Sequence, residues 1–280
     1  MKQEYKMQNE FNHCFALCAY QVNPNLEECV QTLLAQTLQT KIIMITGSPN
    51  DHISSVARKY NLPLFENPSP TNMGGNWNYA YKMADTDYVT IAHEDDLYDK
   101  DYAASVASAV QGRTSPLIIF TDYHELNEKT LIKDSRLLNI KRRMNAPFRL
   151  RAFQSSRFIR NRILSFGCSI CCPSVTYNKA ACTDFAFDEE FYCNLDWDAW
   201  TRISKSKGSF IYIPKPLMIH RIHEQSETTR LLKAGIRQAE DLKIFKRFWP
   251  DWIAGRLLRR YNEGAESNNL LANAEDNKIS

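Results

Sequence analysis

Strand-like and helix-like segments alternate along the first 120 residues, and this alternation constrains the fold more than any other feature of the sequence. Short apolar runs recur between longer stretches in which apolar residues are spaced three and four apart, as they are on one face of a helix. A chain with this order forms a mainly parallel sheet with helices on both faces. The sequence therefore predicts an α/β fold with a Rossmann-like arrangement.

The individual elements can be placed from the same pattern. We predict strands at 15–19, 41–46, 63–66 and 88–92, and helices at 26–39, from 51 onward and at about 75–84. The turn Gly47-Ser48-Pro49-Asn50 is typical of a tight connection, and Asp51 is predicted to cap the helix that follows it. From about residue 230 the pattern is helical again, and the polar end beyond Asn262 is predicted to be a frayed tail.

The acidic run His93-Glu94-Asp95-Asp96 directly follows the apolar strand at 88–92. Open α/β sheets bind their ligands at the carboxyl ends of the strands, so this run predicts a binding site there. Grouped carboxylate oxygens suit a hard divalent cation such as Mg²⁺ or Mn²⁺, which in turn holds a diphosphate. The sequence thus indicates chemistry on a nucleotide or its sugar conjugate. The alternative is a solvated acidic loop or a helix cap.

Cysteine content bears on the compartment. Eight cysteines could form disulfides, but the N-terminus lacks the apolar stretch of a secretory signal, so we predict reduced thiols in a cytoplasmic protein. Cys168, Cys171 and Cys172 could be half of a zinc site, although core thiols are the favoured interpretation because no second ligand pair has suitable spacing. No segment approaches the roughly 18 consecutive apolar residues of a membrane span.

The segment 133–162 is strongly basic. It holds ten Lys or Arg residues against a single acid, with aromatic and aliphatic residues among them. Nucleic acid is not the predicted partner, because the segment lacks a recognisable motif and the whole chain has a net charge of only +3. We predict that 141–162 lies against anionic lipid, peripherally at the inner face of the membrane. The alternative is a solvated helical face.

A series of motifs resembles one family in its order and spacing. The motifs are Leu17-Cys18-Ala19-Tyr20-Gln21, Leu33-Leu34-Ala35-Gln36-Thr37, Gly75-Asn76-Trp77-Asn78-Tyr79-Ala80, His93-Glu94-Asp95-Asp96, Leu195-Asp196-Trp197-Asp198-Ala199-Trp200 and His220-Arg221-Ile222-His223-Glu224-Gln225-Ser226. Together they resemble the family 2 glycosyltransferases of the GT-A fold, over roughly residues 13 to 228. The resemblance implies a nucleotide-sugar-binding half at 1–120, an acceptor-binding half at 121–228 and a C-terminal helical region and tail at 229–280.

The resemblance also implies a reaction. The enzyme would use Mn²⁺ or Mg²⁺ to transfer a sugar, with inversion, from a nucleotide diphosphate donor to a glycan or lipid-linked acceptor hydroxyl, in surface polysaccharide synthesis. The implied roles are general base for Asp196, metal binding for Asp95, Asp96 and His223, and donor binding for Ala19, Tyr20, Gln21, Ser48, Asn76, Asn78, His93, Glu94 and Arg221. Asp196 could instead cap its helix, and Asp198 is the rival base.

The chain departs from the family pattern at three points. Ile45-Thr46-Gly47-Ser48-Pro49 lacks the Asp that holds a uracil ring, so the donor nucleoside stays open. His93 stands where the family has an acid, and Leu195 stands where it has Glu.

Two other classes of function are alternatives for a chain with these motifs. A non-catalytic GT-A-like binding protein is the alternative, although such a protein would not need both Asp95 and Asp196. A nucleotidyltransferase would carry a Gly- and Arg/Lys-rich phosphate loop, and residues 19–25 contain none.

Overall fold

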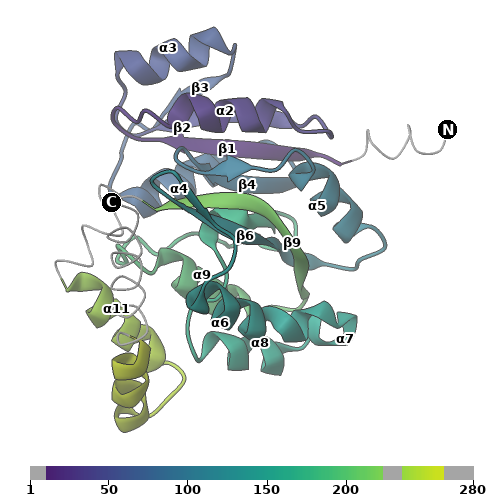
Figure 1. The fold of residues 1–280 in the computed structure, drawn as a ribbon, viewed down its shortest axis with the longest axis vertical. Coiled ribbons are helices and arrows are strands. Elements are labelled where there is room, and N and C mark those ends of the chain that lie inside the picture. Colours follow the sequence, from purple (N-terminus) through teal and green to yellow (C-terminus); the bar gives the residue numbers. More distant parts are fainter. Residues whose placement is uncertain (1–10, 223–234, 262–280) are drawn as a thin grey trace.

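A computed structural model describes residues 11–222 and 235–261. Within these ranges the chain forms one nine-stranded sheet in the order β3-β2-β1-β4-β8-β6-β9-β5, with β7 paired to β6 (Figure 1). The strands are β1 (His13–Ala19), β2 (Lys41–Thr46), β3 (Leu64–Glu66), β4 (Tyr88–His93), β5 (Leu97–Tyr98), β6 (Pro116–Asn127), β7 (Thr130–Ile132), β8 (Val175–Asn178) and β9 (Ser209–Ile222).

The first four strands of the chain are parallel, as predicted. β1 lies between β2 and β4 and pairs in parallel with both, and β3 extends the sheet beyond β2. β8 runs antiparallel to both β4 and β6, whereas β6 and β9 pair in parallel. The mainly parallel α/β sheet is therefore confirmed, with β8 inserted antiparallel at its centre.

Helices cover both faces of the sheet (Figure 1). Successive side chains of a strand point to opposite faces, and Phe15 and Leu17 of β1 accordingly enter one core while Ala16 enters the other. The helices are α2 (Leu26–Leu34), α3 (Asp51–Lys59), α4 (Met73–Met83), α5 (Tyr102–Val110), α6 (Arg136–Asn145), α7 (Arg151–Gln154), α8 (Arg157–Leu164), α9 (Leu195–Ile203) and α11 (Ile236–Phe245), with short 3₁₀ turns at η1 (Ala146–Arg149) and η2 (Cys172–Ser174). Helices α2, α3 and α5 pack in the first core, and α4, α8, α9 and α11 pack in the second.

The capping residue of one helix and the first residue of another differ from those predicted. The Asn50 side chain, not that of Asp51, caps α3 by accepting the Ile53 N–H at 3.0 Å. Asn72 caps α4 in the same way by accepting the Gly75 N–H at 3.0 Å, so α4 begins at Met73. In both cases an extended asparagine satisfies an N–H that has no partner inside the helix.

The predicted helix at 26–39 ends earlier, at Leu34. The buried Gln36 side chain donates to the Asp99 carbonyl at 2.8 Å and accepts the Ala103 N–H at 2.9 Å. Residues 35–39 therefore tie α2 to the start of α5 instead of continuing the helix. Among the described helices, none combines the length and apolar character that a bilayer crossing requires.

Candidate active site

The carboxyl ends of β1, β2 and β4 meet at one edge of the sheet. In the strand register Cys18 lies opposite both Ile45 and His93. The loops after these strands are joined by hydrogen bonds, since the Tyr20 N–H donates to Glu94 Oε2 at 3.1 Å and the Gln21 N–H donates to Ser48 Oγ at 2.7 Å. The sheet thus brings together three segments that sequence analysis assigned to donor binding.

His93, Asp95 and Asp96 form a cluster with metal-ligand spacing. One ligand atom from each lies within 4.8 Å of the other two. His93 Nε2 and Asp96 Oδ2 are buried and have no hydrogen-bond partner in the described part of the chain. Two carboxylates and an imidazole suit Mn²⁺, so the residues fit the predicted cation. His93 was predicted to contact the donor rather than the metal, and the predicted ligand His223 lies outside the described residues.

Asp96 also anchors the end of β9. Its Oδ1 accepts hydrogen bonds from the His220 Nδ1 at 2.9 Å and from the Arg221 backbone N–H at 3.0 Å. Burial disfavours the charged form of His220, but the charge and hydrogen bond of Asp96 outweigh this effect and raise the pKa of His220 to about 9. The buried carboxylate is thereby paired with a cation from a strand more than a hundred residues away.

Burial also sets the protonation of the two residues before Asp95. It raises the pKa of Glu94 to about 8, against the opposing effect of the Tyr20 N–H. It lowers the pKa of His93, although the charges of Asp96 and Asp95 act in the opposite direction. The His93 ring stacks on Trp77, with ring centroids 4.8 Å apart. A neutral, fixed imidazole is the form that can bind a metal ion.

Arg221, predicted to bind phosphate, is held by protein groups. Its Nε donates to the Asp95 carbonyl at 2.9 Å, and its guanidinium forms an ion pair with Glu28 at 2.8 Å. Sequence analysis did not identify Glu28, which lies 193 residues away in the chain. The position beside Asp95 agrees with a place next to a diphosphate, and such a contact would compete with Glu28.

The two asparagines of α4 have different surroundings. Asn76 accepts a hydrogen bond from Asn67 Nδ2 at 2.9 Å and lies so close to Gly47 that a Cβ there would be 2.5 Å from its Oδ1. Asn76 is therefore next to the loop that carries Ser48. Asn78 instead bonds the backbone of Phe187 in both directions, at 2.7 and 3.0 Å, which fixes the loop before α9.

Asp196 lies in the first turn of α9. Its Oδ1 accepts the Trp197 N–H at 2.7 Å, and the Cys168 thiol donates to its Oδ2 at 3.6 Å. The residue at the helix cap position is Asn194, so the interpretation of Asp196 as the cap is wrong. Burial raises the pKa of Asp196. The charge of Asp196 is the smallest of several effects that oppose the burial-driven lowering of the His93 pKa, so Asp196 lies within electrostatic range of that imidazole.

Asp198, the rival candidate for the base, forms ion pairs with two arginines. It is fully buried and forms ion pairs with Arg202 at 2.7 Å and with Arg247 at 2.6 Å. The two guanidinium groups occupy both oxygens of this carboxylate, which holds the fold together and leaves neither oxygen to face an acceptor hydroxyl. Asp196 is accordingly the better of the two candidates for a base.

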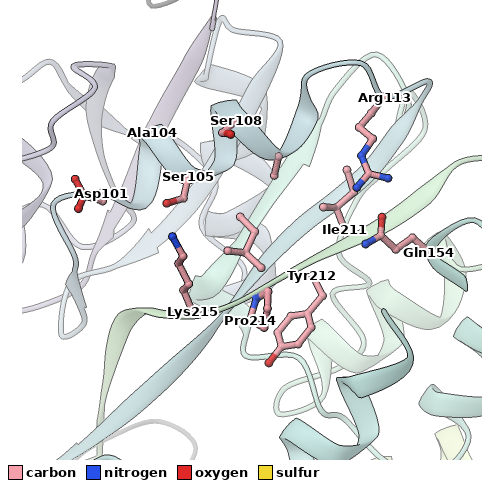
Figure 2. Close-up of a pocket in the computed structure, with 12 residues that line it drawn as sticks. Asp101, Ala104, Ser105, Ser108, Arg113, Gln154, Ile211, Tyr212, Pro214 and Lys215 are labelled. Carbon is pink, nitrogen blue, oxygen red and sulfur yellow. The ribbon is translucent and has the colours of Figure 1, made fainter. Parts of the chain in front are cut away.

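A hollow of about 490 Å³ lies apart from this site, between α5 and β9 (Figure 2). Its lining side chains include Asp101, Arg113, Gln154 and Lys215. None of the residues predicted for donor, metal or acceptor lines it.

Several site residues were missed from the sequence. Trp77 stacks on His93 and the Cys168 thiol donates to Asp196, and no pattern in the sequence links either pair. These contacts join segments far apart in the chain, so no local spacing reveals them.

The chain matches the model of one known protein family over more than half of its length. Residues 14–179 match the family described as Glycosyl transferase family 2. A search of curated proteins gives no match.

Solved structures share the fold. The chain is similar to S. aureus TarS 1-349 in complex with UDP-GlcNAc, with 15% sequence identity, a TM-score of 0.60 and coverage of 89% of this chain and 70% of that one. It covers only 42% of a longer TarS structure. It is also similar to the mannosyltransferase PcManGT from Pyrobaculum calidifontis in complex with GDP-Man and Mn²⁺, with 12% identity, a TM-score of 0.60 and coverage of 98% and 82%. These similarities confirm the predicted GT-A fold.

Proposed function

The chain belongs to glycosyl transferase family 2 and is a nucleotide-sugar glycosyltransferase, and on that premise we propose that it requires Mn²⁺ or Mg²⁺ and transfers its sugar with inversion. The observation that carries the proposal is the cluster of His93, Asp95 and Asp96 at the end of β4, with metal-ligand spacing. The mannosyltransferase neighbour was solved with Mn²⁺, which agrees with this choice of ion.

In this proposal Asp95 and Asp96 hold the cation, with His93 adjacent and His223 as a further ligand. A bound Mn²⁺ or Mg²⁺ would neutralise the charge that gathers on the leaving nucleoside diphosphate. Buried Asp96 keeps its Oδ1 on His220 and Arg221, which leaves Oδ2 for the ion. Arg221 then lies on the diphosphate side of the cluster, beside the Asp95 carbonyl.

Asp196 is proposed as the general base. It would take the proton from the acceptor hydroxyl as that oxygen bonds to the anomeric carbon and the bond to the diphosphate oxygen breaks. A base opposite the leaving group gives inversion. The raised pKa of Asp196 makes it a better proton acceptor than an exposed aspartate.

The donor would lie along the loops after β1 and β2. Ala19, Tyr20, Gln21, Ser48, Asn76 and Glu94 border this space, whereas Asn78 acts on it through the 187–189 loop. The neighbours were solved with UDP-GlcNAc and GDP-Man, so UDP and GDP sugars are the first donors to test. For the acceptor we propose a glycan or lipid-linked hydroxyl of a surface polysaccharide.

The test is a panel of UDP-, dTDP- and GDP-sugars with Mn²⁺, with nucleotide release as the readout. Asp95→Ala should abolish metal-dependent donor binding, whereas Asp196→Asn should retain binding and lose transfer by a factor of about 10² to 10⁴. Asp85→Ala, in the exposed loop before β4, is the matched control and should change neither. If no donor turns over with any divalent ion, or if the two site variants behave alike, the proposed roles are wrong.

A further inference from the structure

Several large aromatic side chains are exposed in the C-terminal half of the chain. Phe158 of α8 is 69% exposed, Phe166 is 47% exposed and Trp252 is 67% exposed. The Arg162 guanidinium lies over the rings of both Phe158 and Trp249, and Phe166 packs against Trp249 with ring centroids 5.6 Å apart. We call the four residues that these contacts join (Phe158, Arg162, Phe166 and Trp249) the arginine-aromatic face, and the exposed Trp252 follows Trp249 by three residues.

The chain around this face is mainly basic. Residues 136–166 contain nine Lys or Arg and no acid, and residues 249–261 contain three Arg against one acid, Asp251, which is paired with Lys246 at 3.3 Å. Among the described residues, neither the exposed Arg157 nor the exposed Arg162 forms an ion pair. Exposed aromatic rings between unpaired guanidinium groups are the pattern of a surface that binds an anionic bilayer.

Other arginines of the segment have structural roles instead. The fully buried Arg160 donates to the carbonyls of Ser204 and Ser206 at 3.0 and 2.8 Å. Arg142 is paired with Asp122 at 2.8 Å. Only some of the basic side chains of the 141–162 segment are therefore available to bind a ligand, and Arg157 and Arg162 are among them.

The face is connected to the candidate base. The Trp197 indole, next to Asp196, donates to the Leu164 carbonyl at 2.9 Å, and the Trp249 indole donates to the Ser165 carbonyl at 2.7 Å. Phe166 follows directly, only two residues before Cys168, whose thiol contacts Asp196. One short segment therefore lies between the exposed aromatic rings and the carboxylate proposed to activate the acceptor.

We propose that the arginine-aromatic face docks on an anionic lipid bilayer and so presents Asp196 to the hydroxyl of a lipid-linked acceptor. The aromatic rings enter the headgroup region, and Arg157 and Arg162 bind lipid phosphates. Charge complementarity identifies the occupant, because a mainly basic face whose one acid, Asp251, is paired with Lys246 fits anionic lipid. This inference rests on the proposed function, since it names the class of acceptor for the same site.

The test is flotation of the full chain with vesicles of phosphatidylcholine alone and of phosphatidylcholine mixed with phosphatidylglycerol. We expect binding to the anionic vesicles only, weakened by salt. Arg157→Gln should lower the partition coefficient about fivefold, and Phe158→Ser about tenfold. The matched controls are Arg58→Gln on α3, at the opposite end of the molecule (Figure 1), and Leu131→Ser on the β6–β7 hairpin, and neither should alter binding.

Two results would overturn the proposal. One is absence of flotation with anionic vesicles. If Phe158→Ser in that case dissociates a dimer, the face binds a second copy of the chain and not lipid. The other is equal flotation of the site variants and the controls.

Failure of docking can be told apart from failure of the proposed function. Phe158→Ser and Arg157→Gln should release nucleotide from the donor without vesicles at the wild-type rate. Asp95→Ala should still float, because it lies outside the face. Loss of nucleotide release in both face variants would mean that they damage the fold, and circular dichroism would then show it.

Discussion

The Glu240 carboxylate accepts the backbone N–H of Asn194 at 2.9 Å. It also accepts the N–H groups of Tyr192 and Cys193, at 2.7 and 2.9 Å, so three consecutive amides converge on one buried side chain of α11. These amides immediately precede α9 and Asp196. Helix α11 therefore holds the segment that carries the proposed base.

From this contact we expect Glu240→Gln to lower kcat by about tenfold to a hundredfold while the donor KM stays near its wild-type value. The substitution removes the negative charge and turns one acceptor into a donor that faces N–H groups. The exposed ion pair of Glu190 with Lys243 provides the matched control, because Glu190→Gln breaks a contact of little energetic value. Steady-state kinetics separate the two parameters, and an equal change in kcat and donor KM would contradict a positioning role.

The acid limb of the pH profile should report Asp196. Burial raises its pKa, and the Cys168 thiol opposes this by hydrogen bonding to the carboxylate. A base must be ionised to act, so transfer should fall as pH drops through the raised pKa. Cys168→Ala removes the donor and should move this limb to higher pH. Cys182→Ala, whose thiol contacts the Leu117 carbonyl in the core, should leave the limb in place, and an unshifted limb in Cys168→Ala would refute the coupling.

A substitution at Gly47 tests how tightly the loop after β2, where the chain departs from the family's motif, packs against Asn76. A Cβ at Gly47 would lie 2.5 Å from Asn76 Oδ1 and 2.8 Å from Pro70 Cβ. We expect Gly47→Ala to lower the free energy of unfolding by about 1 to 3 kcal/mol through overpacking, and to raise the donor KM. Gly255 has nothing within 4 Å of its added Cβ and lies in a helix, so Gly255→Ala should stabilise by about 0.5 to 1 kcal/mol. Urea denaturation measures both, and a neutral Gly47→Ala would show that Asn76 can move freely.

Local periodicity was enough to predict the first half of the fold. The strand 41–46 was placed at the residues observed, because its apolar run and the turn after it are local signals. The acidic cluster followed from the same logic, since residues after a parallel strand must lie at the sheet's carboxyl edge. Arg221 and Glu28 were different, because their contact spans 193 residues and depends on how β9 pairs with β6 and β5. Pairing between distant strands leaves no mark on the spacing of residues within either one.

Asp241 offers a prediction about stability. Burial raises its pKa from 3.8 to about 6, although Arg237 and the Asn194 amide, which donates to Asp241 Oδ1 at 2.8 Å, act in the opposite direction. A carboxyl group with a raised pKa in the folded state binds its proton more tightly there than in the unfolded chain. Its contribution to stability is complete below pH 3.8 and is lost as pH rises through about 6.

Asp241→Asn keeps the acceptor for Asn194 but does not titrate. We therefore expect the free energy of unfolding of the wild type, relative to Asp241→Asn, to fall by up to about 3 kcal/mol as pH rises from below 4 to above 6. Urea denaturation at several pH values measures this difference. If the wild type instead gained stability over the variant with rising pH, the Arg237 charge would dominate burial, and the Asn194 amide would donate to an ionised Asp241 that is paired within α11.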